Sequence, residues 1–223
     1  MGKDQINTLV ISDIHLGSPV SDRKKVLEIL SLNFKTLIIN GDLFDSHSFH
    51  RFNKKDWAVL SKLRKLTKTH KVIFIKGNHD PDGEFLSAIT GMEFVNSYSF
   101  VLNARAFYLE HGDKFDHWIK HRPFVTWVFT GLYFWLQTID KSHNLSRMIK
   151  RLSKSWIDAK NIVASKFIAK HGMKYDVILA GHTHFPEVVE YFGGYYVNSG
   201  SFCEKVCTHV EIYDDGSFQL KNR

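Results

Sequence analysis

Polar residues of the kinds that bind metal ions follow five short apolar runs in the sequence. Asp13 and His15 come after residues 8–11, and Asp42 follows residues 36–39 through a glycine. Imidazole, carboxylate and amide groups together suit Mn²⁺, Fe²⁺ or Zn²⁺, whereas Ca²⁺ prefers oxygen ligands throughout. The pattern therefore predicts chemistry on divalent metal ions. The other three runs end in GNHD, HGD and GHTH, which supply Asn78, His79, Asp80, His111, His182 and His184.

The repetition of this pattern carries more weight than any one of its members. A single histidine or Gly-Asp pair after a strand is usually a turn residue or a hydrogen-bonded surface residue. Asp13 and His15 are two positions apart, so both can point into one crevice at the carboxyl end of a strand. Five such groups in order, each next to a glycine or an apolar run, are poorly explained as five unrelated turns.

The apolar runs themselves indicate the elements that position these residues. We expect buried strands at 8–11, 36–39, 72–75, 107–109 and 177–179. Helices are expected at 21–32, capped by Ser21, and at 54–67. Alternating strands and helices favour a mostly parallel sheet covered on both faces, hence an α/β sandwich. Its carboxyl-terminal part is expected to be rich in strands, at 185–192, 195–199, 207–213 and 217–221.

Composition limits the class of protein. With 223 residues, 43% of them hydrophobic, the chain is expected to form one domain, residues 1–223. The first residues lack an apolar stretch typical of a signal peptide, so we expect a cytoplasmic protein. Cys203 and Cys207 are too few for a disulfide framework. The net charge of +7 and the pI near 9.3 favour phosphate-bearing partners: nucleotides, nucleic acids or anionic lipid head groups.

Residues 114–170 interrupt the alternation of strands and helices. Residues 124–139 carry no charge, but this stretch is shorter than the ~20 residues that a membrane-spanning helix needs. The following segment is amphipathic, with Ala159 and Val163 among its apolar positions and lysines on its other faces. Two interpretations stay open: a helical pair packed on the main sheet, or a cap whose aromatic side chains contact lipid or an acyl substrate.

The motifs resemble the five blocks of the calcineurin-like metallophosphoesterases, which here read DIH, GDLFD, GNHD, HGD and GHTH. The resemblance implies a two-sheet, four-layer α/β/β/α sandwich. It also implies a metal site in which Asp42 bridges two ions, because a carboxylate screens two cations about 3.5–4 Å apart. His79 would contact the phosphate or protonate the leaving oxygen, with Asp80 orienting its ring. The resemblance assigns Asp13, His15 and His184 to one ion, and Asn78, His111 and His182 to the other.

A narrower resemblance is to the bacterial UDP-2,3-diacylglucosamine diphosphatases of lipid A synthesis. It rests on NGDLFDSH, HGDKFD, GHTHFP and the ending YYVNSGSFCEKVCTHVEI. It implies a helical cap at 114–170, Mn²⁺ as the favoured ion, and hydrolysis of a nucleotide-linked lipid to lipid X and UMP at the inner face of the cytoplasmic membrane. His79 departs from this family, whose well-studied members have Arg there. The expected substrate contacts are Trp118, Phe124, Trp127, Arg147, Lys150 and Arg151.

Three functional hypotheses follow. The first is a hydrolase of a nucleotide-linked lipid that associates peripherally with an anionic membrane surface. The second is a soluble phosphodiesterase or phosphatase for nucleotides or another small phosphate compound; nucleic acid is the less expected substrate. The third is a scaffold that has kept the fold without catalysis, which the intact set of ligand residues disfavours.

Overall fold

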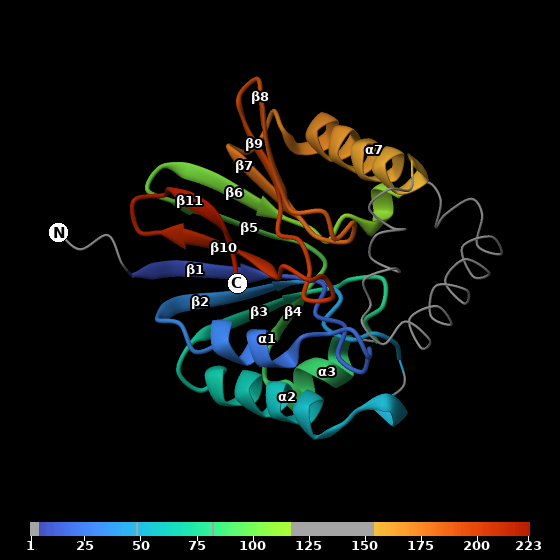
Figure 1. Cartoon of the computed structure of the whole chain (residues 1–223). Coiled ribbons are helices and arrows are strands. Elements are labelled where there is room, and N and C mark those ends of the chain that lie inside the picture. The colour runs from blue at the N-terminus through green and yellow to red at the C-terminus, as the bar shows by residue number, and fades with distance from the viewer. Residues whose placement is uncertain (1–4, 48, 82, 117–153) are drawn as a thin grey trace.

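The computed structural model describes residues 5–47, 49–81, 83–116 and 154–223. In this part of the chain two mixed β-sheets pack face to face and helices cover their outer faces (Figure 1). None of the described helices combines the length and the apolar character needed to cross a membrane. The two packed sheets with helices on their outer faces confirm the predicted α/β/β/α sandwich.

The first sheet carries the amino-terminal motifs. Its strand order is β11-β10-β1-β2-β3-β4; β1 to β4 run parallel, and β10 is antiparallel to both of its neighbours, β1 and β11. The parallel part places the carboxyl ends of β1, β2 and β3 side by side, as the motif pattern requires. The strands are β1 (Ile6–Ile11), β2 (Phe34–Asn40), β3 (Lys71–Ile75), β4 (Glu93–Val95), β10 (Thr208–Tyr213) and β11 (Phe218–Asn222).

The second sheet carries the histidine motifs. Its order is β5-β6-β7-β9-β8, with β6, β7 and β9 parallel and with β5 and β8 antiparallel at the edges. The carboxyl ends of β6 and β7 therefore lie together. The strands are β5 (Tyr98–Leu102), β6 (Arg105–Leu109), β7 (Val177–Ala180), β8 (Glu187–Tyr191) and β9 (Gly194–Asn198).

Side-chain alternation along the strands separates three apolar layers. Val10, Ile38 and Phe107 belong to the layer between the two sheets, where they are fully buried. Leu9 and Leu37 point the other way, under α1 (Arg23–Ile29), α2 (Lys54–Leu66) and α3 (Gly83–Thr90). The helix α7 (Lys154–His171) packs on the second sheet through Phe167. Short 3₁₀ helices occur at η1 (Phe49–Arg51) and η2 (Asp113–Phe115).

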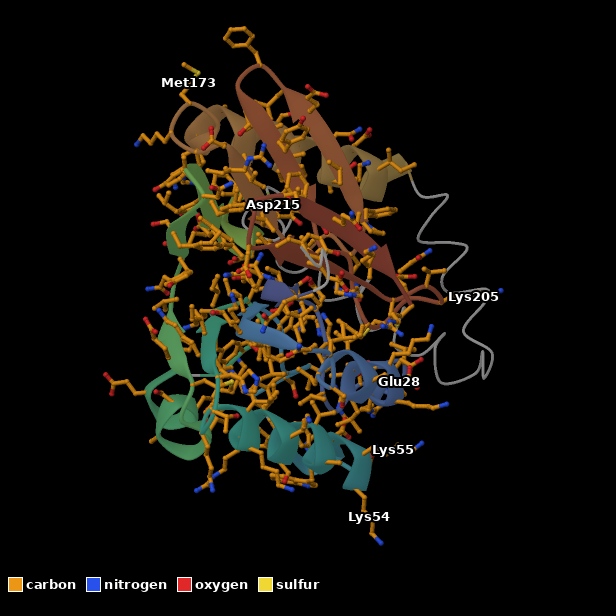
Figure 2. The ribbon with its side chains drawn as sticks, turned by 90° about the vertical axis from the view of Figure 1, so that its left-hand side faces the viewer. Glu28, Lys54, Lys55, Met173, Lys205 and Asp215 are labelled. Atoms are coloured by element: carbon orange, nitrogen blue, oxygen red, sulfur yellow. The ribbon has the colours of Figure 1, made fainter. Side chains whose placement is uncertain are left out.

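Charged side chains project from the outer helices and from a loop near them. Figure 2 shows Glu28 of α1 and Lys54 and Lys55 of α2 extending away from the ribbon, together with Lys205 from the loop before β10. This side-chain arrangement matches the amphipathic pattern expected for helices that cover a sheet.

Three details differ from the sequence-based expectations. The cap of α1 is Asp22, whose carboxylate accepts the Lys25 N–H, while the Ser21 hydroxyl donates to the Ile14 carbonyl at 2.6 Å. The sheets are mixed rather than mostly parallel. The elements α3, β4 and β5 were not expected; β4 has only three residues, too short for a period to be recognised.

Residues 117–153 lie outside the described residues, and with them most of the predicted insert. Its carboxyl-terminal part is described: Ala159 and Val163 are buried on α7, as the amphipathic pattern predicted. That helix forms the outer layer of the second sheet, as the packed-helix interpretation expects of this part. The predicted cap stays a prediction.

Candidate metal centre

Backbone hydrogen bonds join the strand ends of the two sheets into one surface. The N–H groups of Asp13 and His15 donate to the carbonyls of Gly41 and Asp42 at 3.1 and 3.0 Å, which ties the end of β1 to the end of β2. The His182 N–H donates to both Asp13 carboxylate oxygens, at 3.1 and 3.0 Å. The first sheet is thereby fastened to the second at the predicted ligands.

Several candidate ligands have left-handed backbone conformations, which are rare outside glycine. This conformation costs roughly 1–3 kcal/mol per residue and usually persists where function requires it. The remaining described non-glycine residues with positive φ are Asn103 and Ala104, in the turn between β5 and β6. The strain is therefore concentrated at the predicted metal ligands, where φ is 50° for Asp13, 50° for His15, 52° for Asp42, 64° for His182 and 59° for His184.

The glycines of the motifs make room for ligands from other strands. A β-carbon on Gly41 would lie 2.2 Å from Nδ1 of His111, which is far inside van der Waals contact. This explains why Gly precedes the polar residue in GD, GN and GH: a larger side chain would displace a ligand of another motif. The close pairs are Gly41 with His111, Gly77 with Asp42, and Gly181 with Asp13.

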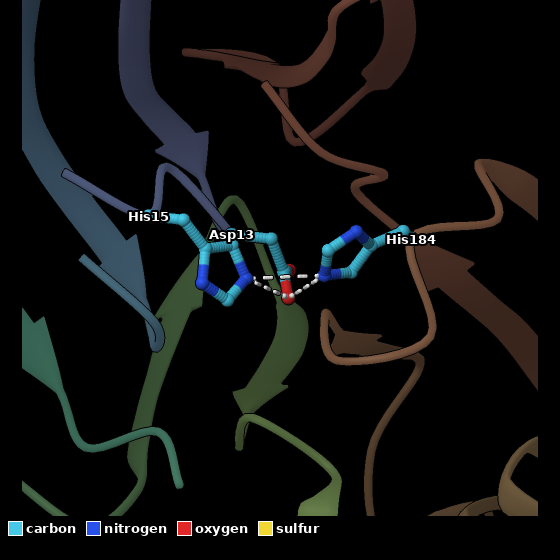
Figure 3. A group of neighbouring side chains, drawn as sticks. All are labelled: Asp13, His15 and His184. Atoms are coloured by element: carbon cyan, nitrogen blue, oxygen red, sulfur yellow. Dashed lines mark hydrogen bonds and ion pairs between the residues drawn. The ribbon is translucent and has the colours of Figure 1, made fainter. Parts of the chain in front are cut away.

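The first group of ligand atoms consists of Asp13, His15 and His184 (Figure 3). Nε2 of His184 lies 3.1 Å from the Asp13 carboxylate and 3.2 Å from Nε2 of His15. Burial acts to raise the pKa of Asp13, but the charges of His184 and His111 outweigh it and lower that pKa to about 2. Burial lowers the pKa of His15 to about 3, which leaves its ring neutral, as a metal ligand must be.

The second group consists of Asp42, His111 and His182. The Asp42 carboxylate lies 3.3 Å from Nε2 of His111 and 3.7 Å from Nε2 of His15, so it faces both groups. Burial acts to raise the pKa of Asp42, but His111 holds this pKa well below its usual value. Burial acts to lower the pKa of His111, but Asp42 holds this pKa well above 6.5. Asn78 completes this side, with Oδ1 3.1 Å from Nδ1 of His182.

These atoms fit divalent ions. Nδ1 of His111 lies 2.9 Å from the Asn40 carbonyl and must donate to it, so only Nε2 is available to a metal ion. The proton that Asp42 favours on Nε2 occupies the position that a divalent cation would take between the two groups. Atoms bound to one ion at about 2.0–2.2 Å lie roughly 3–3.5 Å apart, which is the spacing seen in both groups.

The predicted role of Asp80 needs correction. Its carboxylate does not contact the His79 ring but accepts the backbone N–H groups of Asp42, Phe44 and Gly77 at 2.8, 3.0 and 2.8 Å. Burial, with the charge of Asp42, raises the pKa of Asp80 to about 7. Asp80 thus joins the loops after β2 and β3 and fixes the backbone of Asp42.

The His79 ring is positioned by the Asp45 carbonyl and not by Asp80, which was the prediction. Its Nδ1 lies 3.0 Å from the Asp45 carbonyl, and its backbone N–H donates to the Asp42 carboxylate at 2.9 Å. The ring packs edge-on against His15, with centroids 4.9 Å apart. His79 therefore lies beside His15 of the first ligand group and Asp42 of the second.

Two acidic residues have closer contacts with the site than the sequence indicated. The Asp116 carboxylate lies 3.0 Å from Nε2 of His182, and the second Asp of HGDKFD was the available signal. Asp45, expected as a turn or supporting residue, is buried 3.6 Å from Nδ1 of His15 and forms an ion pair with Arg51. Asp113 begins η2.

The predicted substrate contacts Trp118, Phe124, Trp127, Arg147, Lys150 and Arg151 lie outside the described residues.

Comparison with known proteins agrees with this geometry. The calcineurin-like phosphoesterase family model matches residues 6–186. The solved structure of an archaeal phosphodiesterase is similar over 97% of this chain and 99% of its own, with 18% identity and a TM-score of 0.54. Yfce, a phosphoesterase from E. coli, is similar over 96% of this chain and 97% of its own, with 18% identity and a TM-score of 0.51. No curated protein sequence matches the chain.

At 18% identity the two solved structures establish likeness of fold. The family match extends from β1 past the GHTH motif and so includes every predicted ligand. Members of this family depend on two metal ions, and the two ligand groups found here agree with that requirement. The chain belongs to the calcineurin-like phosphoesterase family and is a metal-dependent phosphohydrolase.

Proposed function

We propose that seven residues of this chain hold two divalent ions, with Asp42 between them. The observation that carries the proposal is the position of Asp42, which lies within ligand distance of residues on both sides. Mn²⁺ is the proposed ion, with Fe²⁺ and Zn²⁺ as alternatives, because the donors mix nitrogen and oxygen. One ion is assigned to Asp13, His15, His184 and Asp42, the other to Asn78, His111, His182 and Asp42.

The surrounding residues support phosphoester hydrolysis. When bound, the two ions activate water and neutralise charge on the phosphoryl oxygens. His79 is half-buried beside both groups and can donate a hydrogen bond to the phosphate or a proton to the leaving oxygen. Asp116 contacts His182 and would keep that ring oriented. The proposed reaction is hydrolysis of a phosphodiester or phosphoanhydride.

An Asp42→Ala variant tests this proposal. We expect hydrolysis of bis(p-nitrophenyl) phosphate to fall by at least about a thousandfold, because the residue shared by both ions is lost. Asp214→Ala is the matched control, since Asp214 is exposed on the far side and forms an ion pair with Lys35. Full activity of the Asp42 variant would refute the assignment.

For the substrate, we propose a nucleotide-linked lipid cleaved at a membrane surface. The support is in the sequence: the uncharged aromatic stretch 124–136 and the basic residues after it. Deleting residues 124–136 should abolish hydrolysis of the lipid in mixed micelles and spare bis(p-nitrophenyl) phosphate. Lipid hydrolysis that survives the deletion would eliminate this substrate model and leave a small phosphate compound.

A further inference from the structure

Glu110 is a buried carboxylate that the proposed reaction does not use. It is the first residue after β6, it immediately precedes the proposed ligand His111, and it is only 3% exposed. Its backbone N–H donates to the Leu179 carbonyl at 3.3 Å, which ties the end of β6 to β7. Burying a carboxylate is costly unless the group is paired, so its partners indicate what it contributes.

Three elements meet at the Glu110 carboxylate. The Lys114 ammonium, from η2, donates to Oε1 at 2.7 Å, and the Tyr108 hydroxyl, from β6, donates to Oε2 at 2.9 Å. Nε2 of His171, in the last turn of α7, lies 3.5 Å from Oε2. Glu110 therefore joins the sheet, the η2 turn and α7.

The η2 turn is also held by an aromatic contact with α7. The Phe115 ring packs edge-on against Phe167, with centroids 5.3 Å apart. Phe167 is fully buried in the apolar layer between α7 and the second sheet. The turn is thus fixed by two contacts, an ion pair with Glu110 and a ring contact with α7.

The fixed turn presents Asp116 to a metal ligand. The Asp116 N–H donates to the Asp113 carbonyl at 3.0 Å, and the Asp116 carboxylate lies 3.0 Å from Nε2 of His182. Because an ionised carboxylate only accepts hydrogen bonds, Nε2 carries the proton, and Nδ1 of the neutral ring is left to bind an ion. That nitrogen lies 3.1 Å from Oδ1 of Asn78, which is a proposed ligand of the same ion.

This contact concerns one ion more than the other. Asp116 contacts the His182 ring, which belongs to the second ligand group. The first group instead uses the backbone N–H of His182, which donates to the Asp13 carboxylate. A displaced Asp116 would therefore weaken the ion of the second group and affect the ion of the first group much less.

We propose that Glu110 is a positioning residue for the ion of the second group. It fixes the η2 turn, the turn places Asp116 against His182, and Asp116 determines which ring nitrogen faces the ion. Because α7 holds the same turn, the packing of α7 on the second sheet is coupled to the affinity for this ion. The inference rests on the proposed two-ion site and specifies what controls the binding of one ion.

Titration of the metal-free protein with Mn²⁺ in a calorimeter tests the role of Glu110. In Glu110→Gln an amide nitrogen replaces one accepting oxygen, so one hydrogen bond to this side chain is lost. The affinity for the ion of the second group should fall about tenfold, while that for the other ion stays as in the wild type. The binding step that Asn78→Ala weakens identifies the second group. Unchanged affinity for both ions in Glu110→Gln would overturn the inference.

Glu211→Gln is the matched control. Glu211 is also buried, accepts the Tyr213 hydroxyl at 2.6 Å and lies 3.0 Å from Nε2 of His209, but it belongs to β10 in the first sheet. Both variants should lose stability in urea, and only Glu110→Gln should lose affinity for the ion. An equal loss of affinity in Glu211→Gln would reduce the effect to general destabilisation, and the inference would fail.

A double-mutant cycle tests whether Glu110 acts through Asp116. Asp116→Ala should weaken the ion of the second group about 10–100-fold, because the His182 ring loses the acceptor that orients it. Glu110→Gln should add no further loss in the Asp116→Ala background. Losses that multiply in the double variant would mean that Glu110 acts by another route, contrary to the proposal.

Variants of Lys114 keep the test decisive if Glu110→Gln does not fold. The Lys114 side chain is 57% exposed, so Lys114→Met removes the ion pair with Glu110 at little cost to the core. It should weaken the same ion about threefold, and Lys114→Arg should restore the wild-type affinity. Equal affinities in these two variants would contradict the inference.

The inference and the proposed function can fail separately. If the wild type binds two Mn²⁺ ions and hydrolyses bis(p-nitrophenyl) phosphate, but the Glu110 and Lys114 variants bind both ions as tightly, only the inference fails. If the wild type binds fewer than two ions, the proposed two-ion site fails and the inference fails with it.

Discussion

The layer between the two sheets and the carboxyl ends of the same strands are built in opposite ways. Val10 and Ile38 are fully buried among apolar side chains in ordinary strand geometry. A few residues further along these strands, Asp13 and Asp42 are as deeply buried but are charged and have left-handed backbones. Burying a carboxylate costs several kcal/mol unless it is paired, so this end of the sandwich opposes folding while the layer beneath it favours folding.

The contrast shows how the fold supports its function. The apolar layer fixes the strands, and the strand ends then hold carboxylates and imidazoles closer together than they would stand if free in water. A bound cation would compensate the charge of the buried carboxylates and replace protons on the imidazoles. Changes in the apolar layer should therefore act on stability, and changes at the strand ends on metal binding and activity.

A Phe107→Ala substitution should give the largest change in stability. Phe107 is fully buried between the sheets and stacks on Phe100, with centroids 4.9 Å apart. Truncating a buried phenylalanine costs about 3–5 kcal/mol, through lost burial and a residual cavity. Urea unfolding should show this loss, while kcat per folded molecule stays near the wild-type value. A specific loss of kcat in the folded fraction would break the proposed separation of roles.

A Gly41→Ala substitution should affect the strand ends, although Gly41 is no ligand. Its new methyl group would displace the His111 ring, so metal affinity and kcat/KM should fall by at least about a hundredfold. Gly193→Ala is the matched control: Gly193 also has positive φ, at 100°, but nothing lies within 4 Å of its added β-carbon. If both variants lose activity equally, backbone strain alone explains the effect and the packing account is wrong.

Much of this site could be predicted because its ligands follow buried strands at short, fixed offsets. Asp13, Asp42 and His111 are each two residues beyond the ends of their strands, so the strand pattern alone predicted that they would meet at one edge. The use of Asp80 could not be predicted in this way. Its partners are backbone amides of a loop nearly forty positions earlier, and a contact of that kind leaves no residue pattern.

An Asp80→Asn substitution should give an intermediate effect. The amide has one accepting oxygen for the backbone N–H groups of Asp42, Phe44 and Gly77, so the loop that carries Asp42 loses support. Removing such a supporting residue typically lowers metal affinity about 10–100-fold. Titration of the metal-free protein with Mn²⁺ would measure this, and unchanged affinity would show that Asp80 only stabilises the fold.

The smallest expected effect concerns pH and lies outside the metal centre. His209 is buried on β10 beside Glu211, with Nε2 3.0 Å from Oε1, and burial lowers its pKa below 6.5. The unfolded chain therefore binds more protons than the folded one below about pH 6.5, so stability falls as pH decreases through that range. Between about pH 7 and pH 5 the free energy of unfolding of the metal-free protein should fall less in His209→Gln than in the wild type. The difference between the two falls should be under about 1 kcal/mol. An identical slope would mean that the pKa of His209 is the same in the folded and unfolded chains.

The most direct test of the central claim is the metal content of the purified protein and of Asp42→Asn, measured by inductively coupled plasma mass spectrometry after loading with Mn²⁺. The wild type should retain about two ions per chain, and the variant fewer, because one carboxylate is proposed to serve both ions. Two tightly held ions in the variant, or none in the wild type, would contradict the account.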